Sequence, residues 1–196
     1  MRKLKLQMQM SVDGFVAGAN GEMDWMVFDW GEDIKEHVAQ ITGPVDTIII
    51  GRKLAVGFIP TWSSMLANPE TADAFAKKMV ETPKIVFSKT LAESEWMNTK
   101  LAKGDLIEEV TQLKNQPGGD IIVYGGGTFV SALIKAALVD GFHLFVNPVI
   151  LGDGMTIFKD IESKQNLTLI ASKSFQCGIT ALTYELNRNS LGGAQT

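Results

Sequence analysis

The pattern of hydrophobic and polar positions predicts several strands. Apolar residues occupy every second position from 4 to 10, which is the period of a strand with two different faces. Continuously apolar, β-branched runs at 45–51 and 84–88 predict short strands that are covered on both faces. A further run at 120–127, "DIIVYGGG", predicts a strand that ends in three consecutive glycines.

Apolar residues recur every three or four positions in other segments, which predicts helices with one apolar face. One such helix begins near Asp33 and ends at the Gly-Pro pair at 43–44. The same spacing predicts helices at 69–79, 105–114 and 128–137. These helices separate the predicted strands along the chain.

The last part of the chain returns to strand patterns. Residues 142–151 are extended, and 166–176 with 178–187 alternate as an antiparallel hairpin. Strands that alternate with helices predict an α/β fold with a mostly parallel central sheet covered on both sides. The 196 residues suit one domain, which we expect over 1–188, followed by a disordered polar tail at 189–196.

Composition narrows the classes of function. The chain is 45% hydrophobic and 20% charged, has a formal net charge of -4 and contains no long block of one sign, so we expect no nucleic-acid or membrane partner. No apolar run reaches the roughly 18 residues of a membrane span, and the start lacks a signal-peptide pattern, so we expect a cytoplasmic protein. A single cysteine, with His37 and His143 at no metal spacing, predicts neither a disulfide nor a metal site.

Three predicted strands end in residues that suit an anion. Ligands of open α/β sheets lie beyond the carboxyl ends of the strands. The residues at these ends are Gly51, Arg52, Lys53, Ser88, Lys89, Gly125, Gly126, Gly127 and Thr128. The glycines let backbone amides approach a diphosphate at the start of a helix, and the cations suit the 2′-phosphate that distinguishes NADPH from NADH.

Each of these features has a structural alternative. Basic residues after a strand can simply be solvated, and three glycines can serve a tight crossing of two backbone segments. Common nucleotide motifs are absent, because Val130 occupies the third glycine position of G-x-G-x-x-G and no G-x-x-x-x-G-K-[ST] loop occurs. A dehydrogenase of the common dinucleotide-binding fold and a nucleotide kinase are therefore disfavoured.

Five segments occur in a telling order: "MSVDGFVAG", "IIIGRK", "IVFSKT", "IIVYGGGTF" and "NPVILGDG". Together they resemble the dihydrofolate-reductase-like family, closest to the reductase domain of the bifunctional riboflavin-biosynthesis deaminase-reductase. The resemblance spans about residues 3–187. It implies a three-layer α/β/α fold with about eight strands, an NADPH-dependent reductase of a small pyrimidine- or pterin-like substrate, and a homodimer.

The resemblance also implies roles for residues. It places 51–53 and 88–89 around the adenosine phosphates and 125–128 over the diphosphate, and it places Val16 and Ala17 near the nicotinamide. The "NPVILGDG" segment is typical of the riboflavin branch. Apolar strand surface near 142–151 is a candidate for the dimer contact, although such strands are normally core.

Reduction of a C=O or C=N group also needs a proton, which a carboxyl group of raised pKa can supply. The resemblance to folate reductases implies an acid on the helix after the first loop. By spacing from Trp25, the first candidate is Asp33, followed by Glu32 and Asp29. Asp13 is the second catalytic candidate. The alternatives are a helix cap for Asp33 and an ordinary turn aspartate for Asp13.

Trp25 and Phe28 are candidates to stack on a flat heterocycle, with core packing as the alternative. The sequence lacks the H-x-E and P-C-x-x-C zinc pattern of the deaminase, and Asp24 replaces a proline of folate reductases. We therefore hypothesise a reductase like 5-amino-6-(5-phosphoribosylamino)uracil reductase. The alternatives are a dihydrofolate reductase, a non-catalytic NADP-binding sensor module, or an enzyme whose phosphate site holds a nucleotide substrate.

Overall fold

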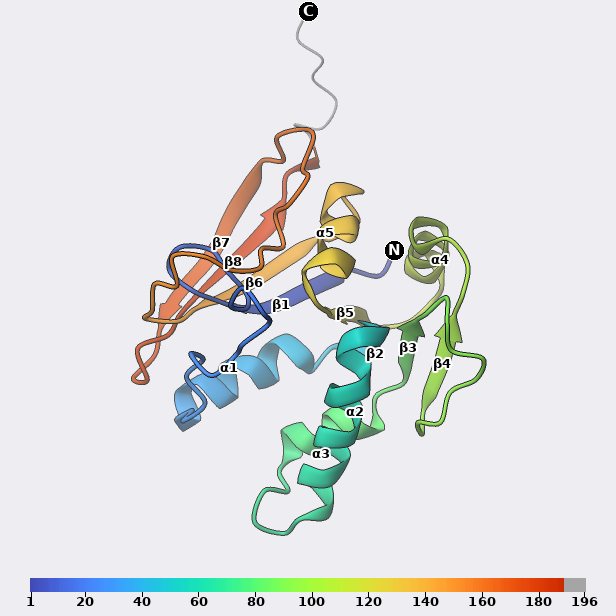
Figure 1. The fold of residues 1–196 in the computed structure, drawn as a ribbon, viewed down its shortest axis with the longest axis horizontal. Coiled ribbons are helices and arrows are strands. Elements are labelled where there is room, and N and C mark those ends of the chain that lie inside the picture. Colours follow the sequence, from blue (N-terminus) through green and yellow to red (C-terminus); the bar gives the residue numbers. More distant parts are fainter. Residues whose placement is uncertain (189–196) are drawn as a thin grey trace, which may run out of the picture.

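The computed structural model describes residues 1–188, so the tail predicted at 189–196 lies outside the described residues. An eight-stranded sheet forms the centre of the molecule, in the order β4-β3-β2-β5-β1-β6-β8-β7 (Figure 1). The strands are β1 Leu4–Met10, β2 Val45–Gly51, β3 Lys84–Phe87, β4 Thr99–Ala102, β5 Asp120–Tyr124, β6 Gly141–Val146, β7 Leu167–Ser174 and β8 Thr180–Leu186. The helices are α1 Glu32–Thr42, α2 Arg52–Ala67, α3 Ala74–Glu81, α4 Leu106–Asn115 and α5 Gly127–Lys135.

The sheet is mostly parallel. Every neighbouring pair from β4 across to β6 is parallel, whereas β8 pairs antiparallel with β6 and with β7. This confirms the predicted fold class with its C-terminal antiparallel hairpin. Gly51 lies opposite Phe87, and Ile50 lies opposite Tyr124. The carboxyl ends of β3, β2 and β5 therefore meet at one edge of the sheet.

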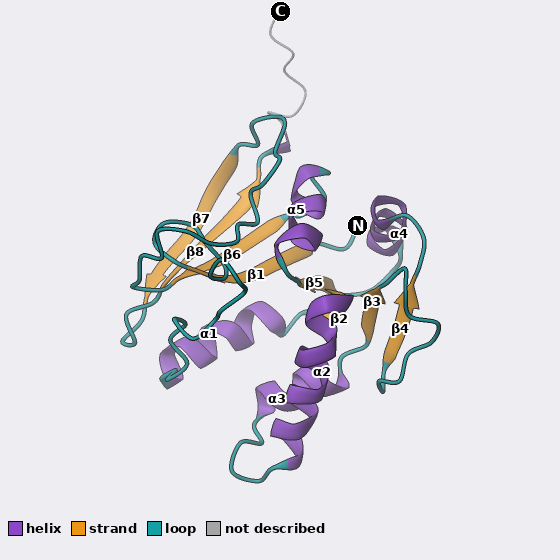
Figure 2. Ribbon diagram, in the orientation of Figure 1, coloured by secondary structure: helices purple, strands orange, loops and turns teal. Residues whose placement is uncertain are grey.

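Helices cover both faces of the sheet, which gives the three layers (Figure 2). Along β2, Ile48 and Ile50 pack with residues of α1, α2 and α3, whereas Ile49 packs with residues of α4 and α5. All three isoleucines are fully buried. The continuously apolar run at 45–51 is thus explained by a strand with two buried faces.

Three details differ from the pattern-based prediction. No helix was expected at α2, because the segment contains Gly57 and Pro60, yet the burial of Ala55 and Ile59 against the sheet outweighs these local preferences. The helix predicted at 69–79 begins only at Ala74, where the Asp73 side chain accepts from the Ala76 amide at 2.6 Å. Strand β4 was missed because it has only four residues, of which two are polar.

The described helices are short, and the longest of them, α2, has 16 residues. None of the helices within 1–188 has the length and apolar character needed to cross a membrane. Nor do three His, Cys, Asp or Glu side chains of this part of the chain come together at a geometry that would hold a metal ion.

Candidate active site

Helices α2 and α5 begin side by side at the carboxyl ends of β2 and β5 (Figure 1). The Phe129 side chain of α5 fills the space between them. A Cβ atom added to Gly51 would lie 3.1 Å from this side chain, and one added to Gly125 would lie 2.6 Å from it. Both glycines are therefore needed for the close packing of the two helix starts.

The other two glycines of the turn differ from each other. A Cβ atom on Gly127 would lie 2.9 Å from the carbonyl oxygen of Thr156, whereas one on Gly126 would meet no atom within 4 Å. None of the three consecutive glycines has a positive φ. A tight crossing thus explains Gly125 and Gly127, and Gly126 faces open space at the start of the helix.

The start of α5 lacks a side-chain cap. Its first residues follow Gly126, and no side chain among residues 1–188 accepts a hydrogen bond from its first amides. Helices α1 and α2 also begin at glycines without a side-chain cap, whereas Asp73 and Asp105 cap α3 and α4. Free amides and the positive end of the helix dipole favour an anion at such a position.

Cations lie beside these helix starts. Arg52 is partly buried, Lys53 and Lys89 are exposed, and none of the three forms an ion pair with another residue of the described chain. The Ser88 hydroxyl accepts from the Thr90 amide at 3.2 Å and from the next amide at 3.0 Å, so it shapes the turn that carries Lys89. We call residues 51–53, 88–89 and 125–128 the basic edge.

Two loops follow the neighbouring strands β1 and β6, and hydrogen bonds join them. These are residues 11–31 and 147–158, here called the paired loops. The Val16 amide donates to the carbonyl of Met155 at 2.8 Å, and the Met155 amide donates to Ala17 at 2.9 Å. Because Thr156 in turn lies against Gly127, the structure brings Val16 and Ala17 close to the glycine turn.

Asp13 holds the paired loops together. Its carboxylate accepts from the Gly152 amide at 2.7 Å and from the Leu151 amide at 3.2 Å. Hydrogen bonding to the Ser11 side chain, and then to these amides, lowers the pKa of Asp13 below its ordinary value. The carboxylate is therefore ionised at neutral pH, and this arrangement suits positioning of the loop rather than proton donation.

Asp33 is engaged by backbone amides as well. Its two carboxylate oxygens accept from the Ile34 amide at 2.9 Å and from the Gln176 amide at 3.1 Å. These bonds tie the start of α1 to the turn between β7 and β8. The neighbouring Glu32 forms an exposed ion pair with Lys35 at 3.0 Å. The geometry thus favours the helix-start alternative for Asp33.

The two aromatic candidates lie in different surroundings. Trp25 is partly buried and donates from Nε1 to the Glu22 carbonyl at 3.0 Å, whereas 73% of Phe28 is exposed. Trp30 was not among the candidates, yet its ring stacks on Phe145 of β6 with centroids 6.3 Å apart. Neither Trp25 nor Phe28 is enclosed as a core residue.

The fully buried Asn147 was also missed by sequence reasoning. Its Oδ1 accepts from the Val27 amide at 2.9 Å, and its Nδ2 donates to the Gln9 side chain at 2.7 Å. This side chain connects the first loop to the ends of β1 and β6. The signal available in the sequence was a polar residue directly after an apolar strand and before Pro148.

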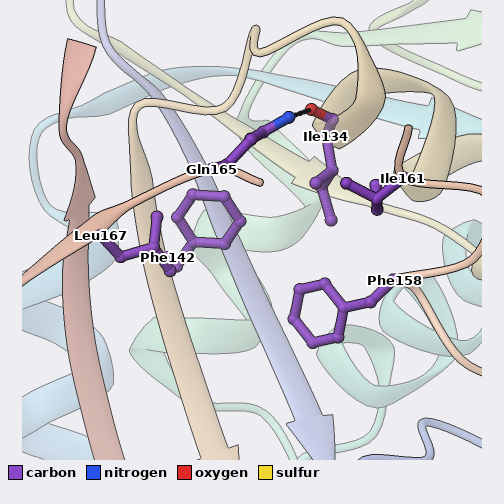
Figure 3. A pocket seen from close by; sticks show the side chains of 6 residues that line it. All are labelled: Ile134, Phe142, Phe158, Ile161, Gln165 and Leu167. Carbon is purple, nitrogen blue, oxygen red and sulfur yellow. Dashed lines mark hydrogen bonds between the residues drawn. The ribbon is translucent and has the colours of Figure 1, made fainter. Parts of the chain in front are cut away.

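An apolar cavity of about 240 Å³ lies elsewhere (Figure 3). It is lined by Ile134, Phe142, Phe158, Ile161, Gln165 and Leu167. Phe142 and Leu167 stand at the starts of β6 and β7, and Ile134 is near the end of α5. The cavity is therefore at the amino ends of these strands, and not at the basic edge.

Comparisons with known proteins agree with this architecture. The family model described as the RibD C-terminal domain matches residues 2–181. The uncharacterized protein YyaP of Bacillus subtilis is 33% identical over 190 residues, which cover 95% of this chain and 96% of YyaP. The riboflavin biosynthesis protein RibD of Corynebacterium ammoniagenes is 24% identical over 153 residues, which cover 78% of this chain and 44% of that longer protein.

Solved structures share the fold. A deaminase/5-amino-6-(5-phosphoribosylamino)uracil reductase of Thermotoga maritima superposes with a TM-score of 0.67 and 15% identity, covering 95% of this chain and 57% of that one. A dihydrofolate reductase of Enterococcus faecalis, in complex with NADP(H), gives a TM-score of 0.58 and 17% identity, covering 94% and 96%. The chain therefore belongs to the family of the RibD C-terminal domain, with a dihydrofolate-reductase-like fold.

Proposed function

We propose that the protein is an NADPH-dependent reductase of a small heterocyclic substrate, with the coenzyme on the basic edge and the substrate beside the paired loops. The observation that carries this proposal is the uncapped start of α5, next to three cations that lack partners among residues 1–188. The family and the reductases of the same fold support it.

The residues of the basic edge fit such a coenzyme. Gly126 leaves open space at the helix start, where a side chain would stand in front of the amides. We assign the diphosphate to residues 125–128, and the additional phosphate of the adenosine to Arg52, Lys53 and Lys89. Ser88 contributes by shaping the turn of Lys89.

The bound nicotinamide would supply a hydride. In our proposal, Val16 and Ala17 lie along the nicotinamide, because their loop is bonded to Met155 and reaches the glycine turn through Thr156. Asp13 keeps the second of the paired loops in place. Trp25 and Phe28 offer flat surfaces to a heterocycle, and Asp33 fixes the start of α1 beside them.

Because of these relatives, we propose a riboflavin-pathway pyrimidine as the first substrate to test. Dihydrofolate is the alternative substrate, since a dihydrofolate reductase shares the fold. A non-catalytic NADP-binding sensor is the alternative of another class, and the engagement of Asp13 and Asp33 by backbone amides is the observation that favours it.

Fluorescence titration with NADPH, NADH and ATP tests the coenzyme site. We expect NADPH to bind at least about tenfold more tightly than NADH, which corresponds to about 1.4 kcal/mol. Equal affinity for all three ligands would contradict a clamp for the additional phosphate. Turnover assays at the reduced-nicotinamide absorbance then separate an enzyme from a sensor, because the sensor binds NADPH and reduces no substrate of the panel.

We further propose a single reductase domain over 1–188 that works in the cytoplasm as a homodimer. In the segment near 142–151, where the dimer contact was expected, strand β6 is paired on both sides and its Phe142 and Phe145 are buried, whereas Ile150 is exposed. The edge strand β7 is the better surface, since all eight of its residues are exposed. Light scattering of the wild type and of Leu169→Glu tests this, because the variant should be monomeric.

A further inference from the structure

The paired loops have no cationic side chain to offer a substrate. Within 11–31 and 147–158 there is no lysine, arginine or histidine. The carboxylates in these loops are Asp13, Glu22, Asp24, Asp29 and Asp153. Proteins recognise phosphate chiefly with arginine, lysine or free backbone amides. The side chains of the paired loops thus carry five negative charges and no positive one.

Carboxylates of the chain occupy several backbone amides of the paired loops. The Asp13 carboxylate already occupies the amides of Leu151 and Gly152, and Asp153 occupies the Gly154 amide at 2.8 Å. In the middle of the first loop, Glu22 accepts from the Asn20 amide at 3.0 Å. These four amides are therefore not free to bind a phosphate.

Apolar side chains are exposed on the same two loops. They are Val12, Met23, Phe28, Ile150, Met155 and Phe158, of which Phe28 and Ile150 are each 73% exposed. Hydrogen bonds keep the loops together, for example from the Val12 amide to the Val149 carbonyl at 2.9 Å. Exposed apolar surface held in this way is typical of a ligand-binding region.

We propose that the substrate is an uncharged, apolar carbonyl or imine compound, and that the paired loops discriminate against substrates that carry a phosphate. This rests on the proposed reductase function. The hydride of NADPH adds to the carbon of the C=O or C=N bond, a proton from water adds to the oxygen or nitrogen, and NADP⁺ is released with the alcohol or amine. The phosphoribosylated pyrimidine named for the Thermotoga relative would then be a poor substrate.

Calorimetry with matched pairs of ligands tests this inference. One pair is 5-amino-6-(5-phosphoribosylamino)uracil and the same compound without its phosphate, and the other is 4-hydroxybenzaldehyde and its phosphate ester. We expect the uncharged member of each pair to bind at least about tenfold more tightly. The difference should narrow as salt is added, because salt screens the repulsion. Equal or tighter binding of the phosphorylated members would overturn the inference, and so would failure of every uncharged member to bind.

A charge variant makes the test sharper. Ile150→Lys adds a cation to the exposed tip of the second loop, and Ile150→Gln is the matched neutral control. We expect the lysine variant alone to improve binding of the phosphorylated compounds about tenfold at low salt. Each titration is carried out with and without NADP⁺. Failure of the coenzyme to bind therefore contradicts the proposed function and still leaves the discrimination measured.

Discussion

The basic edge and the paired loops lie at the same end of the sheet, yet they differ in whether carboxylates of the chain itself bind their backbone amides. On the basic edge, the helix starts of α2 and α5 have no side-chain cap and stand beside Arg52, Lys53 and Lys89. In the paired loops, carboxylates of the chain itself occupy several amides, as Asp13 does at Gly152. One region is prepared for an external anion, and the other supplies its own.

This difference follows from the strand order. The basic edge follows β3, β2 and β5, and the paired loops follow β1 and β6, so the two regions are neighbours across the boundary between β5 and β1. In the proposed reaction, the nicotinamide of a coenzyme with several phosphates must lie next to the reacting carbon. A division between a phosphate-binding side and an apolar side keeps the anionic part of the coenzyme away from the substrate.

A carboxylate introduced at the start of α5, on the basic edge, is expected to have the largest effect on NADPH affinity. In Gly126→Asp, the new carboxylate can cap α5 as Asp73 caps α3. It would then occupy the amides assigned to the diphosphate. We expect NADPH affinity to fall about 100-fold, or about 2.7 kcal/mol, as measured by fluorescence titration.

The neutral variant Gly126→Asn is the matched control for this substitution. It can cap the helix but adds no charge, so its loss of affinity should be clearly smaller. Both variants should unfold at a temperature at or above that of the wild type, because a Cβ atom at this position meets no other atom within 4 Å. If NADPH affinity is unchanged in Gly126→Asp, the coenzyme does not bind at the start of α5.

Acid is expected to destabilise the strands under the paired loops. His143 is on β6. The ring of His37, on α1, lies 6.0 Å from the ring of Phe145, which is also on β6. Burial, and then the nearby Lys5, lowers the pKa of His143 from 6.5 to about 4. His143 therefore binds a proton below about pH 6.5 in the unfolded chain, but only near pH 4 in the folded protein.

The stability supplied by His143 is thus complete above pH 6.5 and is lost as the pH falls towards 4. We expect the free energy of unfolding to drop by about 2 kcal/mol between pH 7 and pH 5, at about 1.4 kcal/mol for each unit of pKa shift. Urea denaturation at the two pH values measures the drop. In His143→Gln, which does not titrate, the decrease should be smaller. An equal decrease in both proteins would assign the effect to other groups.

Removing the cations of the basic edge should weaken one coenzyme selectively. In the double variant Arg52→Gln with Lys53→Gln, we expect NADPH affinity to fall about tenfold, or about 1.4 kcal/mol, and NADH affinity to stay the same. Lys77→Gln is the control, because this lysine is exposed on α3 and lies 3.9 Å from Glu81. Equal losses for both coenzymes would show that the cations do not recognise the additional phosphate.

The strands of the core could be predicted from the sequence because burial on two faces leaves a plain signal. The strand at 45–51 and the strand that ends at Tyr124 were recognised in this way. Helix α2 could not be predicted, since its packing against the sheet overrides Gly57 and Pro60. The same limit explains the missed Asn147, whose partners Val27 and Gln9 are far away in the sequence.

The candidate site was predictable only in part for a related reason. Strand ends identify which residues gather at an edge, so the cations and glycines of the basic edge could be selected. Which glycine faces a ligand depends on neighbours from other elements, such as Phe129 beside Gly125 and Thr156 beside Gly127. Whether a carboxylate is free depends on loop geometry. The sequence could therefore offer the helix-start role of Asp33 and the turn role of Asp13 only as alternatives, and it did not identify their amide partners.

Replacement of Asp13 is expected to have the smallest effect of these substitutions. It also distinguishes a general acid from a residue that positions a loop. Loss of a general acid lowers kcat by about 100-fold or more. Loss of a residue that positions a loop raises KM, because the loop must be ordered again when the substrate binds. Since the Asp13 carboxylate is bonded to the amides of Leu151 and Gly152, we expect Asp13→Asn to raise KM several-fold, to leave kcat nearly unchanged and to leave NADPH affinity intact. A large fall in kcat would instead indicate that Asp13 donates the proton, and that the paired loops take part in the reaction itself as well as positioning the substrate.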